Sequence, residues 1–480
     1  MKKLFFLFFS LQSLLAAAQN VQISDDIYIG GSTGYGVVGK FNDRILFYYL
    51  DNDEVKLRAF DAKMHKIWDR EIEPDYKKSS KVLDIIGNRT DFTVLYQYRK
   101  KNHTYLKAHK YDGQVKLLDS ATVFDWGKDF LTPTLTVRFS EDRRSALVYE
   151  FVDNKKLRAV AFNLDSLRPI WEQTIDAEDW KLEENYQQLV FSNRAEAFFI
   201  QEESNRIGNE KHRFKVQKAD SLGKTSFSLP IKDFAIVDIK FSFDNVNRKL
   251  VGAGVLAVKN LNKSQGYFHF SIPPQYQDAA DLKIYKEGFD DEFVSTLLGK
   301  KVTENKGLMD IKFQEIIHRR DGGILAIFEQ VRLVERRINT NAVTGRFGDG
   351  LRASTDYYHD NFFAVSIAND GTTTWKSVFY KKQMSQDDEG KYSSYCLVKT
   401  PSTLRFLFND EIERATTVSE YTLNSAGTNE RHSVMNTAGQ DLYLRFHDGV
   451  QTGANEVIIP SEDRRRIKLV KIQFILRGID

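Results

Sequence analysis

The segments SALVYEF, residues 145–151, and KLRAVAFNLDSLRPIW, residues 156–171, decide the fold of this chain. The first is a short run of small, aliphatic and aromatic residues, which is typical of a buried β-strand. The second alternates polar and apolar residues, as the two strands of a hairpin do. Because a similar strand followed by a hairpin recurs along the chain, we interpret the fold as one small β-sheet repeated many times.

Eight strands of the first kind can be found. They begin at Arg44, Asp91, Ser145, Glu196, Leu250, Gly322, Thr403 and Asn455. Successive starts lie 47, 54, 51, 54, 72, 81 and 52 residues apart, and five of these seven intervals suit a unit of four antiparallel strands with their turns. We interpret the eight strands as the innermost of their units. The period predicts an all-β fold, a β-propeller of eight blades, with seven blades or tandem β-sandwiches as alternatives.

Three tryptophans end equivalent hairpins in different repeats: Trp68, Trp171 and Trp375. A large ring at the end of an outer strand can cover the side of a blade and pack on its neighbour. We therefore predict a structural role for these side chains rather than contact with a ligand.

The last repeat lacks an outermost strand, because the chain ends soon after IKLVKIQFIL, residues 467–476. The N-terminal stretch VQISDDIYIG, residues 21–30, is strand-like and belongs to no repeat. Open sheet edges are avoided in folded proteins. We therefore expect the N-terminal strand to complete the last blade and close the ring.

The first 18 residues have the features of a secretory signal peptide. Lys2 and Lys3 precede a nearly continuous apolar run from Leu4 to Leu15, and three alanines end at Ala18. We expect cleavage near Ala18 and one propeller domain over residues 19–480, located in the periplasm or secreted. No later segment is long and apolar enough to predict a membrane span.

Charge and cysteine content argue against nucleic-acid binding and against a disulfide or a reactive thiol. Without Lys2 and Lys3, 67 of the 69 basic residues stand against 66 acidic ones. This balance gives no electrostatic argument for binding nucleic acid. The one cysteine, Cys396, cannot form an intramolecular disulfide and lies in the strand-like stretch SSYCLV, so we expect a buried, unreactive thiol. The expected state is a monomer.

Two insertions account for the two long intervals. In the first, residues 276–305, the spacing of Phe289, Phe293 and Leu297 predicts a helix with acidic residues at its start. The second, residues 331–359, lies inside the sixth repeat and is expected to form a long loop or hairpin.

The second insertion also holds the candidate binding residues, which combine arginine with aromatic side chains. They are Arg332, Arg336, Arg337, Arg346, Phe347, Arg352, Tyr357 and Tyr358. Long loops in compact domains are usually functional or disordered, and arginine and tyrosine dominate binding hot spots. We predict a contact surface for a protein or glycan partner here. The structural alternative is a solvated hairpin that packs over a neighbouring blade.

Motifs for catalysis or cofactor binding are incomplete. GYGVVGK, residues 34–40, has the spacing of a phosphate-binding loop, but Phe41 occupies the place of the required hydroxyl and a strand follows. The nine histidines are scattered, without a close pair at helical ligand spacing. We therefore predict no catalytic residue, no metal ligand and no cofactor.

Several segments between Gly288 and Asn409 form a distinctive series: FDDEF, IIHRRDGGILAIFEQ, YYHDNFFAVSIANDGTTTW, and KKQ followed by YSSY. In this region, about a quarter of the chain, the sequence resembles a family of uncharacterised exported β-propeller proteins of Gram-negative bacteria. The resemblance implies a propeller fold and export. It implies no activity and no catalytic residue.

Recognition rather than chemistry is the expected function. We expect an exported, non-enzymatic propeller that acts as a binding or scaffold module for a protein or glycan partner in the cell envelope. One alternative is a carbohydrate-active or other hydrolytic enzyme with its site in the central channel, which would need carboxylates or histidines with perturbed pKa values at the channel mouth. Another alternative is an envelope assembly factor.

Overall fold

In the computed structural model of this chain, the described residues are 19–30, 34–51, 54–76, 79–128, 131–153, 155–176, 182–273, 276, 282–304, 306–338, 352–412 and 417–474. For residues 182, 183, 337, 338, 352 and 353 the description covers the backbone alone.

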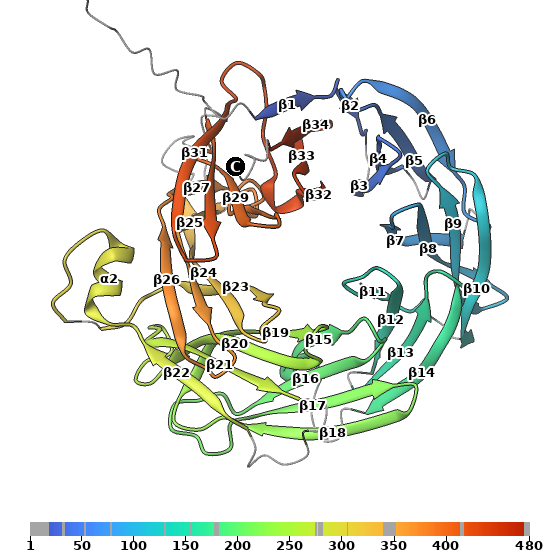
Figure 1. The fold of residues 1–480 in the computed structure, drawn as a ribbon. Helices are drawn as coiled ribbons and strands as arrows, with labels where there is room; N and C mark the ends of the chain where they lie inside the picture. Colours follow the sequence, from blue (N-terminus) through green and yellow to red (C-terminus); the bar gives the residue numbers. More distant parts are fainter. Residues whose placement is uncertain are drawn as a thin grey trace, which may run out of the picture.

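Eight antiparallel sheets stand side by side in a ring (Figure 1), so the predicted eight-bladed propeller of four-stranded sheets is confirmed. We call the region around the axis of this ring, which the inner strands border, the central channel. From inner to outer strand, the blades are β3 (Gly34–Phe41), β4 (Arg44–Asp51), β5 (Glu54–Phe60), β6 (Lys66–Ile72); β7 (Ser80–Gly87), β8 (Asp91–Lys100), β9 (His103–Asp112), β10 (Leu117–Lys128); β11 (Thr136–Phe139), β12 (Ser145–Val152), β13 (Lys156–Asn163), β14 (Arg168–Asp176); β15 (Tyr186–Phe191), β16 (Ala197–Glu203), β17 (Arg213–Asp220), β18 (Gly223–Pro230); β19 (Ala235–Asp244), β20 (Lys249–Ala257), β21 (Gly266–Ile272), β22 (Ile284–Gly288); β23 (Ile311–His318), β24 (Ile324–Ile338), β25 (Arg352–Ile367), β26 (Thr373–Phe379); β28 (Cys396–Lys399), β29 (Thr403–Asn409), β30 (Thr417–Asn424), β31 (Asn429–Asn436); and β32 (Val450–Gly453), β33 (Glu456–Asp463), β34 (Arg466–Gln473), β1 (Asn20–Ile23). The additional elements are β2 (Ile27–Tyr28), β27 (Gln383–Gln386), α1 (Leu182–Asn185), α2 (Asp291–Leu298) and the short 3₁₀-helix η3 (Phe446–Asp448).

The eight strands recognised in the sequence are the second strands of their blades, so their assignment as innermost strands was wrong. In the third blade, for example, β12 is buried along most of its length, whereas the inner strand β11 is largely accessible. A second strand has a partner on both edges and a neighbouring blade on both faces, which requires a nearly continuous apolar sequence. The inner strand borders the channel and keeps polar side chains there.

The N-terminal strand closes the ring, as predicted. β1 pairs with β34 from Asn20 opposite Gln473 to Ile23 opposite Val470, and β2 continues along the same strand. Between them, the hydroxyl of Ser24 accepts a hydrogen bond of 2.9 Å from the backbone N–H of Leu469. Figure 1 shows β1 and β2 beside β34, so the two ends of the described chain are joined by one sheet.

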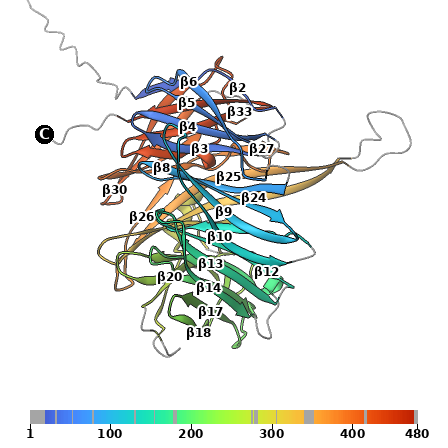
Figure 2. The ribbon, with the colours of Figure 1, turned by 90° about the vertical axis from the view of Figure 1, so that its right-hand side faces the viewer.

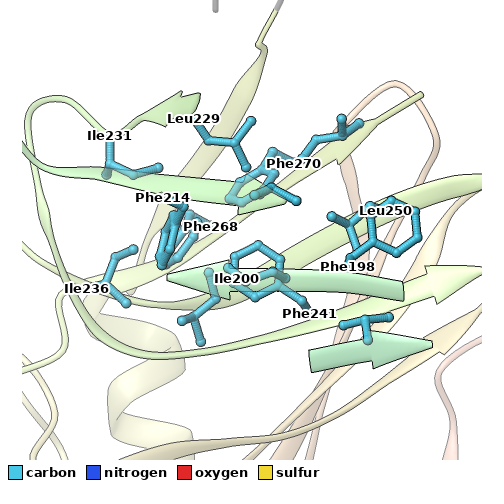
Figure 3. Packing of buried hydrophobic residues seen from close by; sticks show 14 of the residues in the cluster. Phe198, Ile200, Phe214, Leu229, Ile231, Ile236, Phe241, Leu250, Phe268 and Phe270 are labelled. Carbon is cyan, nitrogen blue, oxygen red and sulfur yellow. The ribbon is translucent and has the colours of Figure 1, made fainter. Parts of the chain in front are cut away.

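Apolar side chains fill the spaces between adjacent blades. Figure 3 shows the cluster between the blades β15–β18 and β19–β22. There the rings of Phe214 and Phe241 meet edge to face with their centroids 5.1 Å apart, and Phe241 also packs against Phe270 at 5.9 Å. Because each such cluster needs side chains from two sheets, every blade depends on its neighbours for stability.

The three tryptophans contact neighbouring blades, Trp68 by packing against the apolar cluster between the first two blades, and this confirms their structural role. Trp68, Trp171 and Trp375 lie on the fourth strands of their blades, each beside a β-bulge in the pairing with the third strand. The indole N–H of Trp171 donates to the carbonyl of Ala195 in the next blade at 2.6 Å, and that of Trp375 donates to the carbonyl of Ser425 at 3.2 Å.

Replacing Trp171 with Phe should lower the free energy of unfolding by about 1–3 kcal/mol, because the buried carbonyl of Ala195 loses its donor and a gap opens between the blades. Urea denaturation followed by circular dichroism measures this change. Ile170→Val, at the more exposed neighbouring position, is the matched control and should have a smaller effect, about 0.5 kcal/mol or less. Equal losses in the two variants would argue against the hydrogen-bonded link.

The first insertion contains strand β22 and helix α2. Asp290 caps the helix by accepting a hydrogen bond of 2.7 Å from the backbone N–H of Phe293, and Gly299 ends it in the left-handed conformation. Phe293 and Leu297 are buried from one face of the helix, as the spacing predicted. The acidic residues at its start therefore act as a cap and first turn.

Export is not tested by the fold. The predicted signal peptide, residues 1–18, lies outside the described residues. Among the helices that the structure describes, none combines the length and apolar character needed to cross a membrane.

Candidate binding surfaces

The second insertion is a long extension of one blade hairpin. β24 and β25 remain paired from Val331 opposite His359 to Ile338 opposite Arg352, beyond the point where β23 ends, and β27 pairs with β25 on its other side. We call residues 331–338, 352–359 and 383–386 the arm. Figure 2 shows β24 and β25 projecting together from one face of the ring.

The arm brings several of the predicted binding residues together. The guanidinium of Arg332 lies 4.4 Å from the ring centre of Tyr358, and Arg336 forms an ion pair with Asp356. Tyr357 lies opposite Leu333 on the paired strand. Arg337 lies on β24 and Arg352 on β25, with only their backbone described, and Arg346 and Phe347 lie outside the described residues.

A buried ion pair holds the base of the arm on the ring. The carboxylate of Glu329, on β24, and the ammonium of Lys381 are 2.6 Å apart, and both side chains are almost completely buried. The side chains of Gln314 and Ser394 donate to the same carboxylate at 2.8 and 2.9 Å. Burial alone would raise the pKa of Glu329, but Lys381 and the nearby His359 hold this pKa at about 2. Glu329 is therefore ionised in the folded protein.

One edge of the arm is open. The backbone N–H of Val331 donates to the carbonyl of Asp310 at 2.7 Å, on the side of β24 away from β25. Beyond Val331, no described strand pairs with this edge of β24. Since backbone groups alternate in direction along a strand, Leu333 and Glu335 direct their N–H groups toward the same open edge. The side chain of Leu333 is 61% exposed.

A hollow adjoins the base of this open edge. It has a volume of about 350 Å³ and lies between the end of α2 and the start of the arm. Its lining includes three cations, Lys263, Lys300 and Arg332, two acidic residues, Asp310 and Asp360, and the exposed Met309. Burial raises the pKa of Asp360, which also lines it. The hollow therefore combines an excess of cations over acidic residues with apolar surface.

The wall of the central channel carries two adjoining cavities, of about 550 and 540 Å³. The larger is lined mainly by residues of the inner strands β15, β19, β23 and β28, and the smaller by β11, β15 and β19. They share Phe139, Gln188, Phe191 and Lys240.

Ser242, His318 and Asp244 lie close together in the larger cavity. These are the residue types of the catalytic triad of a hydrolase. The Nε2 atom of His318 is 2.8 Å from the hydroxyl of Ser242, and burial lowers the pKa of His318, which is therefore neutral at pH 7. Its Nδ1 atom is 3.9 Å from the carboxylate of Asp244, too far for the hydrogen bond that orients the base of a nucleophilic triad. We interpret these contacts as a link between β19 and β23.

Two other features could suggest a reactive or metal-binding site: the thiol of Cys396 and a cluster of three glutamates. Burial raises the pKa of Cys396 to about 12, so its thiol is unreactive at neutral pH, as expected. Glu54, Glu71 and Glu73 bring carboxylate oxygens within 4.8 Å of one another on the first blade. Acidic groups this accessible at the end of a hairpin are common without a bound ion.

Sequence reasoning missed the channel cations Arg138 and Lys240. They lie on different inner strands two blades apart, and a period read from apolar strands does not select them. The available signal was the recurrence of polar residues on the strand preceding each apolar run.

No protein-family model and no curated protein sequence matches this chain. Among solved structures, it is similar to an uncharacterised protein of Listeria monocytogenes, with 10% identity over 76% of this chain and 85% of that chain and a TM-score of 0.39. The dipeptidyl peptidase 4 of Porphyromonas gingivalis has 12% identity, coverage of 90% and 56%, and a TM-score of 0.46. The β-propeller domain of the Trilobed protease from Pyrococcus furiosus has 11% identity, coverage of 84% and 98%, and a TM-score of 0.35. Similarities this distant carry no argument about function.

Proposed function

We propose that this chain is an exported binding or scaffold module and that the arm is the surface through which it holds a protein partner. The open edge of β24 carries this proposal. Folded proteins normally cover or shorten such edges, because unpaired backbone groups recruit strands from other chains. An edge that extends away from the ring with an exposed leucine suits a binding element.

The geometry favours a partner that adds a strand to β24. In strand addition, backbone hydrogen bonds supply affinity and the alternating side chains supply specificity. The outward N–H groups of Leu333 and Glu335 can donate the backbone hydrogen bonds to an added strand. Leu333 provides an apolar contact on one face of the strand, and Arg332 lies on the other.

The partner segment is expected to be extended and to carry acidic side chains. Lys263, Lys300 and Arg332 surround the hollow at the base of the edge, where an added strand would continue. Opposite charge at this position would fix the register of the added strand. Export and an envelope partner rest on the predicted signal peptide and on the resemblance of residues 288–409 to exported propellers.

Leu333→Glu should abolish partner capture while leaving the fold intact, because the substitution places a charge where the added strand packs. The native protein, immobilised and mixed with envelope extract, should retain a protein that Leu333→Glu recovers at least about tenfold less well. Leu222→Glu is the matched control, since Leu222 is 96% exposed on the turn between β17 and β18. This control should recover as much as the native protein.

Hydrogen exchange on the purified pair then tests the mode of binding. The captured protein should slow exchange of the backbone amides of Leu333 and Glu335. Equal recovery by native protein and Leu333→Glu would overturn the assignment of the arm. Capture that depends on Leu333 but leaves those amides unprotected would overturn strand addition.

A further inference from the structure

The smaller channel cavity differs from the larger one in the charge of its lining, because the larger one also contains the carboxylates of Glu141, Asp244 and Glu315. Its lining residues are Arg138, Phe139, Gln187, Gln188, Leu189, Phe191, Ile239 and Lys240. The charged residues in this set are both cations, and both are exposed. The neighbouring larger cavity, by contrast, contains Lys399 paired with Glu315 at 3.0 Å.

The side-chain amides of Gln187 and Gln188 in this cavity already form hydrogen bonds within the protein. The side chain of Gln188 donates to the carbonyl of Phe241 at 2.7 Å and accepts from its backbone N–H at 2.8 Å. The amide nitrogen of Gln187 donates to the carbonyl of Ile239 at 3.4 Å. These bonds hold β15 against β19. The hydrogen-bonding groups left for a ligand are therefore chiefly those of the two cations.

Neither cation is neutralised by a carboxylate of the described chain. The ammonium of Lys240 donates to the backbone carbonyl of Gln314 at 2.6 Å, and Arg138 forms no ion pair with any described residue. A lysine keeps two further N–H donors in such an arrangement, and an arginine presents a planar set of donors that matches a carboxylate, sulfate or phosphate.

We propose that this cavity binds an organic anion, whose acidic group lies between Arg138 and Lys240. Its volume of about 540 Å³ is in the range of small-molecule sites. The half-buried Phe139, backed by the edges of Phe191 and Ile239 from the cores between the blades, supplies an apolar wall for the body of the ligand, which an inorganic ion would leave unused. This site is separate from the arm and does not depend on the function proposed for it.

The charge of Lys240 also reaches the opposite part of the channel. The hydrogen bond to Asp448 raises the pKa of His447, in η3, whereas burial and the positive charges of Lys240 and Arg445 act to lower it. An anion bound at Lys240 would offset the positive charge that lowers the pKa of His447. Ligand binding should therefore raise the pKa of His447 further, and histidine NMR resonances can report it.

The test uses the purified full chain at low salt, with benzoate, glucuronate and inorganic sulfate as probes in calorimetric titrations. Benzoate and glucuronate should bind more tightly than sulfate, and both should raise the pKa of His447. Arg138→Gln and Lys240→Gln should each weaken binding of the organic anions about tenfold or more. Lys312→Gln, an exposed lysine on the inner strand β23 outside the cavity, is the matched control and should leave affinity unchanged.

Melting curves of the variants check that the fold is intact. Failure of the native protein to bind either organic anion would overturn the proposal, as would equal weakening by Lys312→Gln. Sulfate binding as tight as that of benzoate would overturn the role of the apolar wall. A glucuronate tetramer that binds more tightly than the monomer would support an acidic polysaccharide as the source of the ligand, and equal binding would support a free small molecule.

Discussion

Deletion of residues 21–29 should lower the melting temperature by on the order of 10 °C and broaden the transition. The deletion removes β1 and β2, exposes the edge of β34 and leaves the fully buried site of Ile27 empty. It also opens the ring, so the last blade no longer shares a sheet with the N-terminal end of the chain. Differential scanning calorimetry of the native and shortened proteins measures the change.

Two point substitutions separate ring closure from simple loss of chain. Ile27→Asp places a charge in the cluster that includes Ile458 and Ile467, and it should reproduce much of the loss in melting temperature. Tyr28→Asp changes the next residue, which is 64% exposed, and should have little effect. An unchanged melting curve after deletion would show that the N-terminal strand does not close the ring.

Removal of either partner of the buried pair at the base of the arm should lower the free energy of unfolding by about 3–5 kcal/mol. Glu329→Gln leaves the ammonium of Lys381 buried without its counter-charge, and Lys381→Met leaves the carboxylate of Glu329 in the same position. The double variant Glu329→Gln/Lys381→Met removes both charges and should recover part of the loss. Chemical denaturation of the four proteins forms the double-mutant cycle, and additive losses would contradict coupling.

The contribution of Glu329 also predicts a dependence on pH. Its folded pKa of about 2 lies below the value of about 4.3 for a free glutamate, so its ionised form stabilises the folded state. This contribution should be complete above about pH 5 and should disappear as the pH falls toward 2. The difference in unfolding free energy between native protein and Glu329→Gln should therefore shrink over that range. A difference that stays constant would argue against an ionised Glu329.

Most of the architecture could be predicted because it depends on local sequence. The apolar second strands, the helix with its acidic start and the tryptophans on the fourth strands all leave a signal within a few residues. The eight apolar strands were wrongly predicted to be the innermost of their blades, whereas they are the second. Apolar content measures how completely a strand is buried, and the second strand is buried more completely than the strand at the channel.

The candidate sites could be predicted only in part. The insertion at residues 331–359 stood out because it broke the period, and the structure places Arg332, Arg336, Tyr357 and Tyr358 on the arm. The open edge of β24 could not be foreseen, since it depends on where β23 stops pairing. The cavity with Arg138 and Lys240 could not be foreseen either, because its residues come from three inner strands.

The amino-acid sequence by itself determined the repeat and the strand that closes the ring, and the structure decided between eight blades and seven. The repeat follows from periodic burial along the chain, and the closing strand follows from the need to pair a last sheet edge. Only the tertiary structure decided that Glu329 meets Lys381 and that Arg138 and Lys240 share a cavity. Such contacts join residues far apart in the chain, and closure of the ring sets the positions and directions of their side chains.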